Sequence, residues 1–217
     1  MSGYSKKVIK IKKSEKTKQL ILHTALDCFS EKGYKDTSTK RIAQEAGIAE
    51  GLIFNYFKTK KSLYDALIDP ILYDLLPKNL EKFMNQNDSR NNFDEFLFSF
   101  YKNRYVYVLV NFKKLKLLFS EIAFNEKKKE EFLSLILNKE LNPLFKILSD
   151  YRKRGEIDSR IKIKNLIVDL ISQFFTSIIK SKLFYNKKIT ENYIDKEVST
   201  MVEHIKLLYG GDKSDRD

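Results

Sequence analysis

The sequence predicts an all-α protein, and three observations support this prediction. The 217 residues include only 7 Gly and 3 Pro, whereas hairpin and sandwich folds need many turn residues. Apolar residues recur at spacings of three and four along most of the chain, which is the period of an amphipathic helix. No strand-like alternation or internal repeat stands out. The length allows one large domain or two smaller ones that share a core.

The N-terminal part is strongly basic. Of the formal charge of +12, a share of +8 falls within residues 1–62, which hold 14 basic and 6 acidic residues. This asymmetry suits a polyanionic partner, although a generally lysine-rich composition would also contribute to it. Residues 1–14 contain five lysines and no acidic residue, so we expect a flexible basic arm. The arm either lies along nucleic-acid phosphates or serves as a solubilising tail.

Residues 15–62 predict three short helices and the start of a fourth. The first begins at Glu15 and stops at Gly33. Thr37 or Ser38 can cap the second helix, and Gly47 ends it. The third covers about 49–57. The apolar residues at helical spacing that should face inward are Ile21, Ala25, Cys28 and Phe29, then Ile42, Ala43 and Ala46, then Ile53 and Phe57.

Residues 63–210 read as a larger helical domain, and 211–217 as a frayed tail after two glycines. A kink or split is expected at Asn142-Pro143, because proline cannot continue a helix hydrogen-bond ladder. The predicted helices of this part, beginning with the one that leaves the N-terminal domain, are 60–76, 78–86, 90–110, 112–124, 127–154, 162–184 and 190–209.

Several classes of protein are disfavoured. Cys28 is the only cysteine, so no intrachain disulfide is expected and a reducing, cytoplasmic location follows. No apolar run approaches the roughly 20 residues that span a bilayer, so no membrane partner is expected. His23 and His204 are far apart, and no nucleophile elbow, phosphate loop or metal-ligand spacing is present. The sequence therefore predicts no catalytic residue, no metal site and no cofactor.

The turn 46–49, with Gly47 inside it, fits a helix-turn-helix, although periodicity alone fits an ordinary helical hairpin equally well. Residues 33–63 as a whole closely resemble the DNA-binding domain of the tetracycline-repressor (TetR) family. The residues that carry this resemblance are Gly33, Tyr34, Thr37, Ser38, Ile42, Ala43, Ala46, Gly47, Gly51, Ile53, Phe54, Tyr56, Phe57 and Lys60.

The resemblance implies a double-stranded DNA operator as partner, with two kinds of contact. Hydroxyls, helix-start amides and cations should bind phosphates, and the outward face of the third helix should read bases. The expected phosphate contacts are Thr37, Ser38, Tyr56 and Lys60, with Lys40 and Lys61 adding charge; the expected base contacts are Ala49, Glu50, Gly51, Leu52 and Asn55. Ala49 and Leu52 depart from the small or hydroxyl residues usual in the family.

The resemblance also implies a homodimer, because one helix-turn-helix reads too few base pairs. Two apolar stripes near the C-terminus offer an interface, or else face their own core. The residues predicted to form the interface are Leu170, Phe174, Ile178, Val198, Met201 and Ile205.

In this family the helical domain surrounds a small-molecule effector. Aromatic residues crowd 93–132, either around a pocket or simply as core, while Asp169 and Gln173 interrupt an apolar stripe and would orient a ligand or pair across the dimer. The candidate pocket residues are Phe96, Phe100, Tyr101, Tyr105, Phe119, Asp169, Gln173 and Phe174. The expectation is a repressor that a small apolar or aromatic effector releases from its operator; the alternative is a non-specific architectural DNA-binding protein without an effector.

Overall fold

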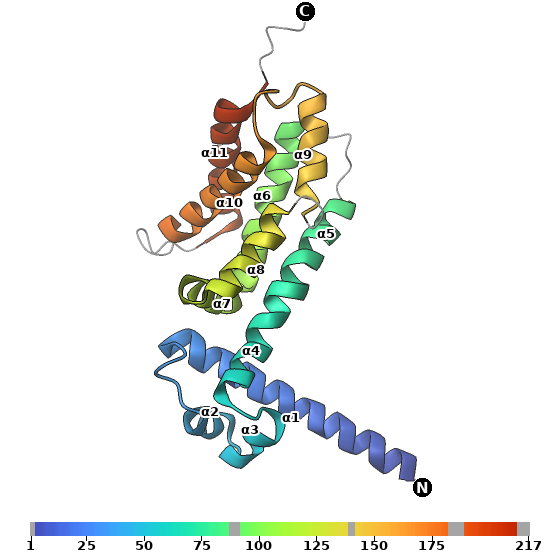
Figure 1. Ribbon diagram of the computed structural model, residues 1–217, viewed down its shortest axis with the longest axis vertical. Coiled ribbons are helices and arrows are strands. Elements are labelled where there is room, and N and C mark those ends of the chain that lie inside the picture. Colours follow the sequence, from blue (N-terminus) through green and yellow to red (C-terminus); the bar gives the residue numbers. More distant parts are fainter. Residues whose placement is uncertain (1–2, 87–91, 139–141, 182–188, 212–217) are drawn as a thin grey trace, which may run out of the picture. The chain divides into compact units, whose positions relative to one another are not determined.

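The computed structural model describes residues 3–86, 92–138, 142–181 and 189–211. Its regular elements in these ranges are all helices, which confirms the all-α prediction (Figure 1). Two compact units are formed, one by residues 1–76 and 111–126 and the other by 77–110 and 127–217. The first unit holds α1 (Gly3–Lys32), α2 (Thr39–Ala46), α3 (Glu50–Tyr56), α4 (Lys60–Pro70), the π-helical η1 (Ile71–Leu75) and α7 (Phe112–Phe124).

Helix α1 begins at Gly3 and thus includes most of the stretch 1–14 for which the sequence predicted a flexible arm. Residues 4–13 contain neither proline nor glycine, and lysine is a good helix former, so the following helix extends through them. The predicted inward face of α1 is confirmed, since Ile21, Ala25, Cys28 and Phe29 are all buried.

The thiol of Cys28 is buried and donates a hydrogen bond to Oε2 of Glu45 at 3.3 Å. Burial and this carboxylate raise the pKa of Cys28 to about 11. The thiol therefore stays protonated at neutral pH and packs as a small core residue of the first unit.

Residues 60–86 form one helical run, where the sequence predicted a break near Pro77. Proline lacks an N–H, and its ring crowds the carbonyl four residues earlier. The π-helical turn η1 lies between Pro70 and Pro77, and such a turn changes the hydrogen-bond register locally. The helical hydrogen-bonding pattern therefore continues into α5 (Leu76–Gln86) despite both prolines.

Helix α7 belongs by its contacts to the first unit, so this unit is larger than the predicted domain 15–62. Lys113 Nζ binds Asp27 Oδ1 on α1 at 2.6 Å, and Lys116 Nζ donates to the carbonyl of Ser30 at 2.6 Å. Leu115, Leu117 and Leu118 of α7 are buried. A segment far along the chain thus completes the core of the N-terminal unit.

Thr59 caps α4, and this cap gives a first prediction. Its hydroxyl accepts from the N–H of Ser62 at 3.0 Å, and the Ser62 hydroxyl accepts from the N–H of Thr59 at 3.0 Å. Because both bonds satisfy donors that the helix leaves open, Thr59→Ala should lower the free energy of unfolding by ~1 kcal/mol. Urea denaturation measures this loss. Thr200→Ala is the control, since Thr200 is an exposed threonine inside α11 and its removal should cost nothing; equal losses in both variants would contradict a capping role.

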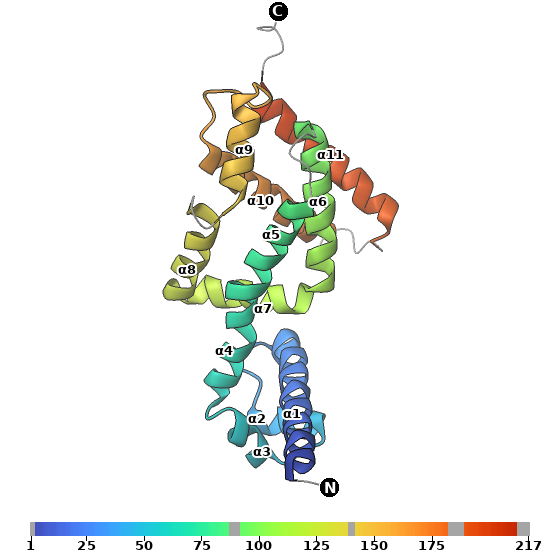
Figure 2. The same cartoon turned by 90° about the vertical axis from the view of Figure 1, so that its right-hand side faces the viewer.

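The second unit contains α5 from Pro77 onward, α6 (Phe93–Val110), α8 (Glu126–Leu137), α9 (Leu144–Lys153), α10 (Ile163–Ile179) and α11 (Glu191–Tyr209). Helix α6 packs most extensively on α11, and α10 packs on both α9 and α11 (Figure 2). The predicted helix 127–154 is split between α8 and α9, which confirms the break at Asn142-Pro143. The last predicted residues of 162–184 lie outside the described part.

The chain end at Gly210 and Gly211 is held in place, so the predicted frayed tail does not begin at residue 211. Gly211 N–H donates to the carbonyl of Glu156 at 3.1 Å, and Gly210 bridges to Ile157. A Cβ on Gly211 would lie 2.1 Å from the Gly155 carbonyl oxygen, so only glycine fits this approach. Residues 212–217 lie outside the described residues.

Candidate nucleic-acid interface

Helices α2 and α3 form a helix-turn-helix in the first unit (Figure 1). The Ser38 side chain caps α2 by accepting the N–H of Arg41 at 3.1 Å. Gly47 ends α2 in the left-handed conformation, at φ 65°, and Ile48 N–H returns to the carbonyl of Ala43 at 3.0 Å. Only glycine adopts this backbone conformation without a Cβ penalty, so Gly47 fixes the angle at which the chain enters α3.

Thr37 does not have the surface position that the sequence predicted. Its side chain is buried, and the hydroxyl donates to the carbonyls of Gly33 at 2.8 Å and Cys28 at 3.2 Å. The hydroxyl therefore fastens the end of α1 to the start of α2. The buried Thr37 side chain is therefore not accessible to a phosphate.

The other residues predicted to contact phosphate differ in their exposure and in the contacts that they already make. Ser38 and Lys40 are exposed. Tyr56 is half-buried, with its hydroxyl 3.2 Å from the Ser14 hydroxyl of α1. Lys60 is held over the ring of Tyr34 at 4.3 Å from its centroid, so its charge has a defined position.

Lys61 is already neutralised within the unit. Its Nζ lies 2.7 Å from Asp65 Oδ1 and 3.2 Å from Glu121 Oε1 on α7. Burial alone would lower the pKa of Lys61, but the two carboxylates outweigh burial and raise it. The predicted phosphate contact by Lys61 is therefore less favourable than an internal one, which ties α4 to α7.

The predicted base-reading residues gather at the start and on one side of α3. Ala49, Gly51 and Asn55 are exposed, and Leu52 is half-buried. Glu50 is half-buried as well, and its Oε1 accepts from the hydroxyl of Thr39 at 2.7 Å, which links α3 to α2. The opposite side of α3 carries Ile53, which is buried as predicted.

Sequence reasoning missed Phe54 as a surface residue. This ring lies on α3 and is 45% exposed, in a helix whose other aromatic residue, Tyr56, is half-buried. The sequence contained a sign of this exposure, because Phe54 follows Ile53, which faces inward, and precedes Asn55, which faces outward. An exposed aromatic side chain beside Asn55 suits apolar contact with a thymine methyl group.

Gly51 gives a prediction in which stability and affinity change in opposite directions. A Cβ at this position meets nothing within 4 Å, and the backbone is ordinary helix. Gly51→Ala should therefore raise the free energy of unfolding by ~0.5–1 kcal/mol. The added methyl projects from the base-reading side, so affinity for DNA should fall by ~10-fold, about 1.4 kcal/mol. Thermal unfolding and fluorescence anisotropy measure the two effects. Unchanged affinity would exclude close approach of α3 to DNA.

The predicted effector residues of the second unit form a packed aromatic core. Phe96, Phe100, Tyr101, Tyr105 and Phe174 are all buried, with Phe96 stacked on Phe100 at 5.9 Å between ring centroids and Tyr105 edge-on to Phe174 at 5.8 Å. The remaining aromatic candidate, Phe119, lies on α7 in the first unit and is half-buried.

A polar row on α10 is bound by tyrosines of the same protomer. Gln173 accepts a hydrogen bond from Tyr101 at 3.2 Å, and Asp169 accepts one from Tyr209. One helical turn further on, the Ser177 hydroxyl lies 3.3 Å from that of Tyr105. Hydrogen bonds within the protomer thus occupy Asp169 and Gln173, for which the sequence predicted contact with a ligand or pairing across a dimer.

The six residues predicted for the dimer interface lie inside the protomer in the structure. The structure buries all six within the protomer, which makes them core; they are Leu170, Phe174, Ile178, Val198, Met201 and Ile205. Apolar residues do lie on the outer side of α10, where Val168 is 40% and Ile179 48% exposed, with Ile171 and Phe175 half-buried between them. On α11 the exposed apolar residues are Leu207 and Leu208.

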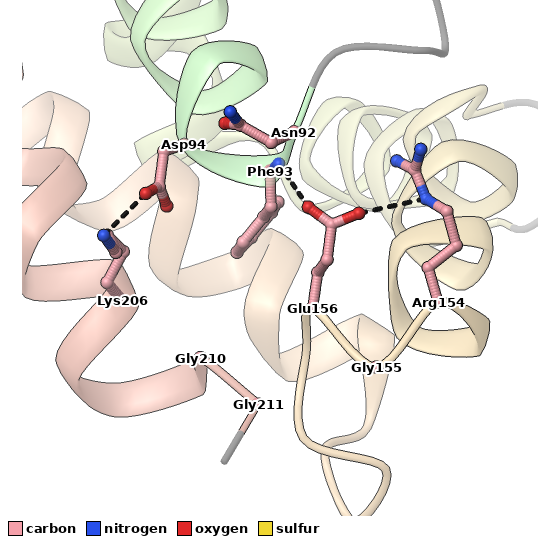
Figure 3. Close-up of a pocket in the computed structure, with 9 residues that line it drawn as sticks. All are labelled: Asn92, Phe93, Asp94, Arg154, Gly155, Glu156, Lys206, Gly210 and Gly211. Atoms are coloured by element: carbon pink, nitrogen blue, oxygen red, sulfur yellow. Dashed lines mark hydrogen bonds and ion pairs between the residues drawn. The ribbon is translucent and has the colours of Figure 1, made fainter. Parts of the chain in front are cut away.

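A pocket of about 360 Å³ lies where α6 begins and α11 ends (Figure 3). Its charges are paired internally: Arg154 Nε binds Glu156 Oε1 at 3.1 Å, and Lys206 binds Asp94. The second oxygen of Glu156 accepts the N–H of Phe93 at 2.6 Å and thereby satisfies the first turn of α6. These polar groups serve the fold and leave few free for a ligand.

Residues 21–67 match the sequence pattern of the bacterial regulatory proteins of the tetR family. The HTH-type transcriptional regulator YvkB of Bacillus subtilis (strain 168), itself uncharacterised, is 42% identical over 52 residues, which are 24% of this chain and 28% of YvkB. IcaR of Staphylococcus aureus (strain Newman), the negative transcriptional regulator of the biofilm operon icaADBC, is 35% identical over 86 residues, which are 38% of this chain and 45% of IcaR. The chain thus matches less than half the length of these relatives.

Solved structures match nearly the whole chain. A TetR-family transcription regulator from Marinobacter aquaeolei VT8 has a TM-score of 0.67 at 12% identity and covers 93% of this chain and 99% of its own. FadR from Bacillus subtilis, solved with stearoyl-CoA, has a TM-score of 0.64 at 18% identity, covering 85% and 95%. At these identities the similarity is one of fold.

The helix-turn-helix and its exposed third helix have the arrangement of a DNA-binding domain of the helix-turn-helix class. Residues 21–67 thus have the sequence pattern of the DNA-binding domain of tetR-family bacterial regulatory proteins, and the all-helical fold is similar to that of TetR-family structures. Within the described residues, no helix combines the length and apolarity that crossing a membrane requires.

Proposed function

We propose that this protein is a sequence-specific transcriptional repressor that binds its operator as a homodimer and is released by a small effector. The exposed side of α3 is the observation that carries the proposal, because Ala49, Gly51 and Asn55 are accessible on a helix braced by α2. In this role Asn55 would read a base, while Ser38, Lys40, Tyr56 and Lys60 would hold phosphates. IcaR, a negative regulator, supports repression as the outcome.

The dimer would form through the outer side of α10, with α11 beside it. The outer apolar stripe, defined as Val168, Ile171, Phe175 and Ile179, recurs at spacings of three and four, so its members share one side of α10. The partner that would cover this stripe is a second copy of the chain, because binding two half-sites requires two copies of α3 and each protomer supplies one. A symmetric pairing of this stripe would cover it in both protomers at once.

Effector binding would act on the DNA-binding unit through helix α7. This helix belongs to the DNA-binding unit, but in the sequence it lies between α6 and α8 of the second unit. Helix α7 is joined by Lys113 to α1 and by Glu121 to Lys61 of α4. A shift of α7 would therefore move α1 and α4 together. The spacing of the two reading helices would then depart from the ~34–36 Å that successive major grooves require, and operator affinity would fall.

Selection of binding sites from random-sequence DNA by the purified protein tests this function. The expected product is a pseudo-palindrome with two half-sites, bound in the presence of excess random DNA at physiological salt. Enrichment of no sequence, with affinity that depends only on salt, would overturn the proposal and favour the architectural alternative.

A further inference from the structure

Arg104 on α6 is a half-buried cation in the second unit, and no carboxylate among the described residues lies within ion-pair distance of it. Its Nη2 donates to the backbone carbonyl and the side-chain Oδ1 of Asn79, and to Oδ1 of Asn103. Its Nε–H is buried and has no acceptor in the described structure. A guanidinium carries five donors, and among the described residues only Nη2 has protein acceptors.

The surroundings of the guanidinium are aromatic. Its central carbon lies 5.2 Å from the ring centroid of Tyr107, 5.7 Å from that of Phe83 and 6.0 Å from that of Phe100. Burial lowers the pKa of Arg104 to about 10. Ring faces attract a cation but do not replace an anion or accept its free N–H groups, so the charge is incompletely compensated.

Arg154 in the same unit provides a direct comparison. Its guanidinium also lies over a ring, 4.3 Å from the centroid of Tyr151, but its Nε binds Glu156 at 3.1 Å. Arg154 is exposed, whereas a buried or half-buried arginine has the greater need of such a partner. Arg104 has the aromatic neighbours and lacks the carboxylate.

We propose that the missing carboxylate is supplied by the effector, which is therefore an amphiphilic anion: a carboxylate head bound by Arg104 on an apolar body that packs against Phe83, Phe100 and Tyr107. This inference rests on the proposed function in naming the ligand an effector. The planar fork of a guanidinium matches a carboxylate with two parallel hydrogen bonds. The side-chain amide of Asn79, whose oxygen faces Arg104, adds an N–H₂ donor beside the same head group.

Three probes separate the head group from the body, and all are titrated calorimetrically into the full-length protein. Sodium decanoate has both parts, decan-1-ol has the body without charge, and inorganic phosphate has charge without a body. Decanoate below its micelle concentration is expected to bind, and to bind at least ~10-fold more tightly than either of the other two, since a charge-assisted pair of hydrogen bonds is stronger than a neutral one. Equal binding of decanol, equal binding of phosphate, or no binding of decanoate would overturn the inference.

Arg104→Met and Arg154→Met form the matched pair of variants. Arg104→Met removes an uncompensated charge and keeps an apolar side chain, so its unfolding temperature should not fall, while decanoate binding should weaken at least ~10-fold. Arg154→Met should bind decanoate as the unaltered protein does. If Arg104→Met does not fold, Arg104→Lys decides, because it keeps the charge, loses the fork and should still bind decanoate several-fold more weakly. Undiminished binding in the folded Arg104 variant would refute the site.

Operator binding is measured separately, with and without decanoate. Binding of decanoate that depends on Arg104 but leaves operator affinity unchanged would support the anion site and contradict release by an effector. If selection finds no operator, the calorimetric comparison still decides the site.

Discussion

Replacing Val168 and Ile179 together by glutamate is expected to convert a dimer into monomers and to lower operator affinity by at least ~100-fold. Both side chains are about half exposed in the protomer, so the protomer should remain folded. In a symmetric interface each new carboxylate would be desolvated near its own copy, which is strongly unfavourable. Separate protomers would lose the gain in operator affinity that comes from linking two DNA-binding units. This loss explains the size of the expected effect.

Light scattering after size exclusion measures the mass, and fluorescence anisotropy measures the affinity. Val106→Glu is the matched control, because Val106 is 48% exposed on α6 and is not part of the outer apolar stripe. It should leave both mass and affinity unchanged. A Val168→Glu, Ile179→Glu protein that stays dimeric would place the interface elsewhere.

Asn55→Ala should remove base discrimination at one position of each half-site. A paired contact between an asparagine and adenine contributes ~1–3 kcal/mol, and a symmetric dimer makes the contact twice, so the total loss on the preferred operator is ~2–6 kcal/mol. Asn55 is exposed on α3, so the fold should be unaffected. Affinity must be measured against operators changed at each position in turn, because the expected result is that one position loses its preference.

Lys40→Ala is the control for Asn55→Ala. Lys40 is exposed and is expected to contact phosphate, so its loss should weaken binding to every sequence alike and reduce the salt dependence by about one charge per protomer. If Asn55→Ala behaves in the same uniform way, Asn55 does not read a base.

The sequence allowed prediction of those features that depend on local chemistry. The cap at Ser38, the left-handed turn at Gly47 and the inward positions of Ile42 and Ile53 each follow from a residue type at a fixed offset, and the structure has all of them. The split before Pro143 follows in the same way from the missing N–H. The class of protein was therefore predictable from about 30 residues.

Features that depend on which helices meet were not predictable. Thr37 looks like a helix cap, and only the approach of the Gly33 and Cys28 carbonyls takes up its hydroxyl. Helix α10 is apolar on two sides, and periodicity cannot say which side faces α9 and α11. The buried side proved to include Leu170, so the stripe available to a partner is the other one. The uncompensated charge of Arg104 is likewise visible only in three dimensions.

Because Asn111–Glu126 belongs with residues 1–76, the backbone passes from one unit to the other three times, after Leu76, after Val110 and after Glu126. A single cut at any of these crossings would divide at least one of the two units between two separate fragments. A fragment that stops at Leu76 would lack the three buried leucines of α7 and expose the apolar surface they cover. The DNA-binding unit is therefore not one continuous stretch of sequence, and transferring it to another regulator requires two separate segments of this chain.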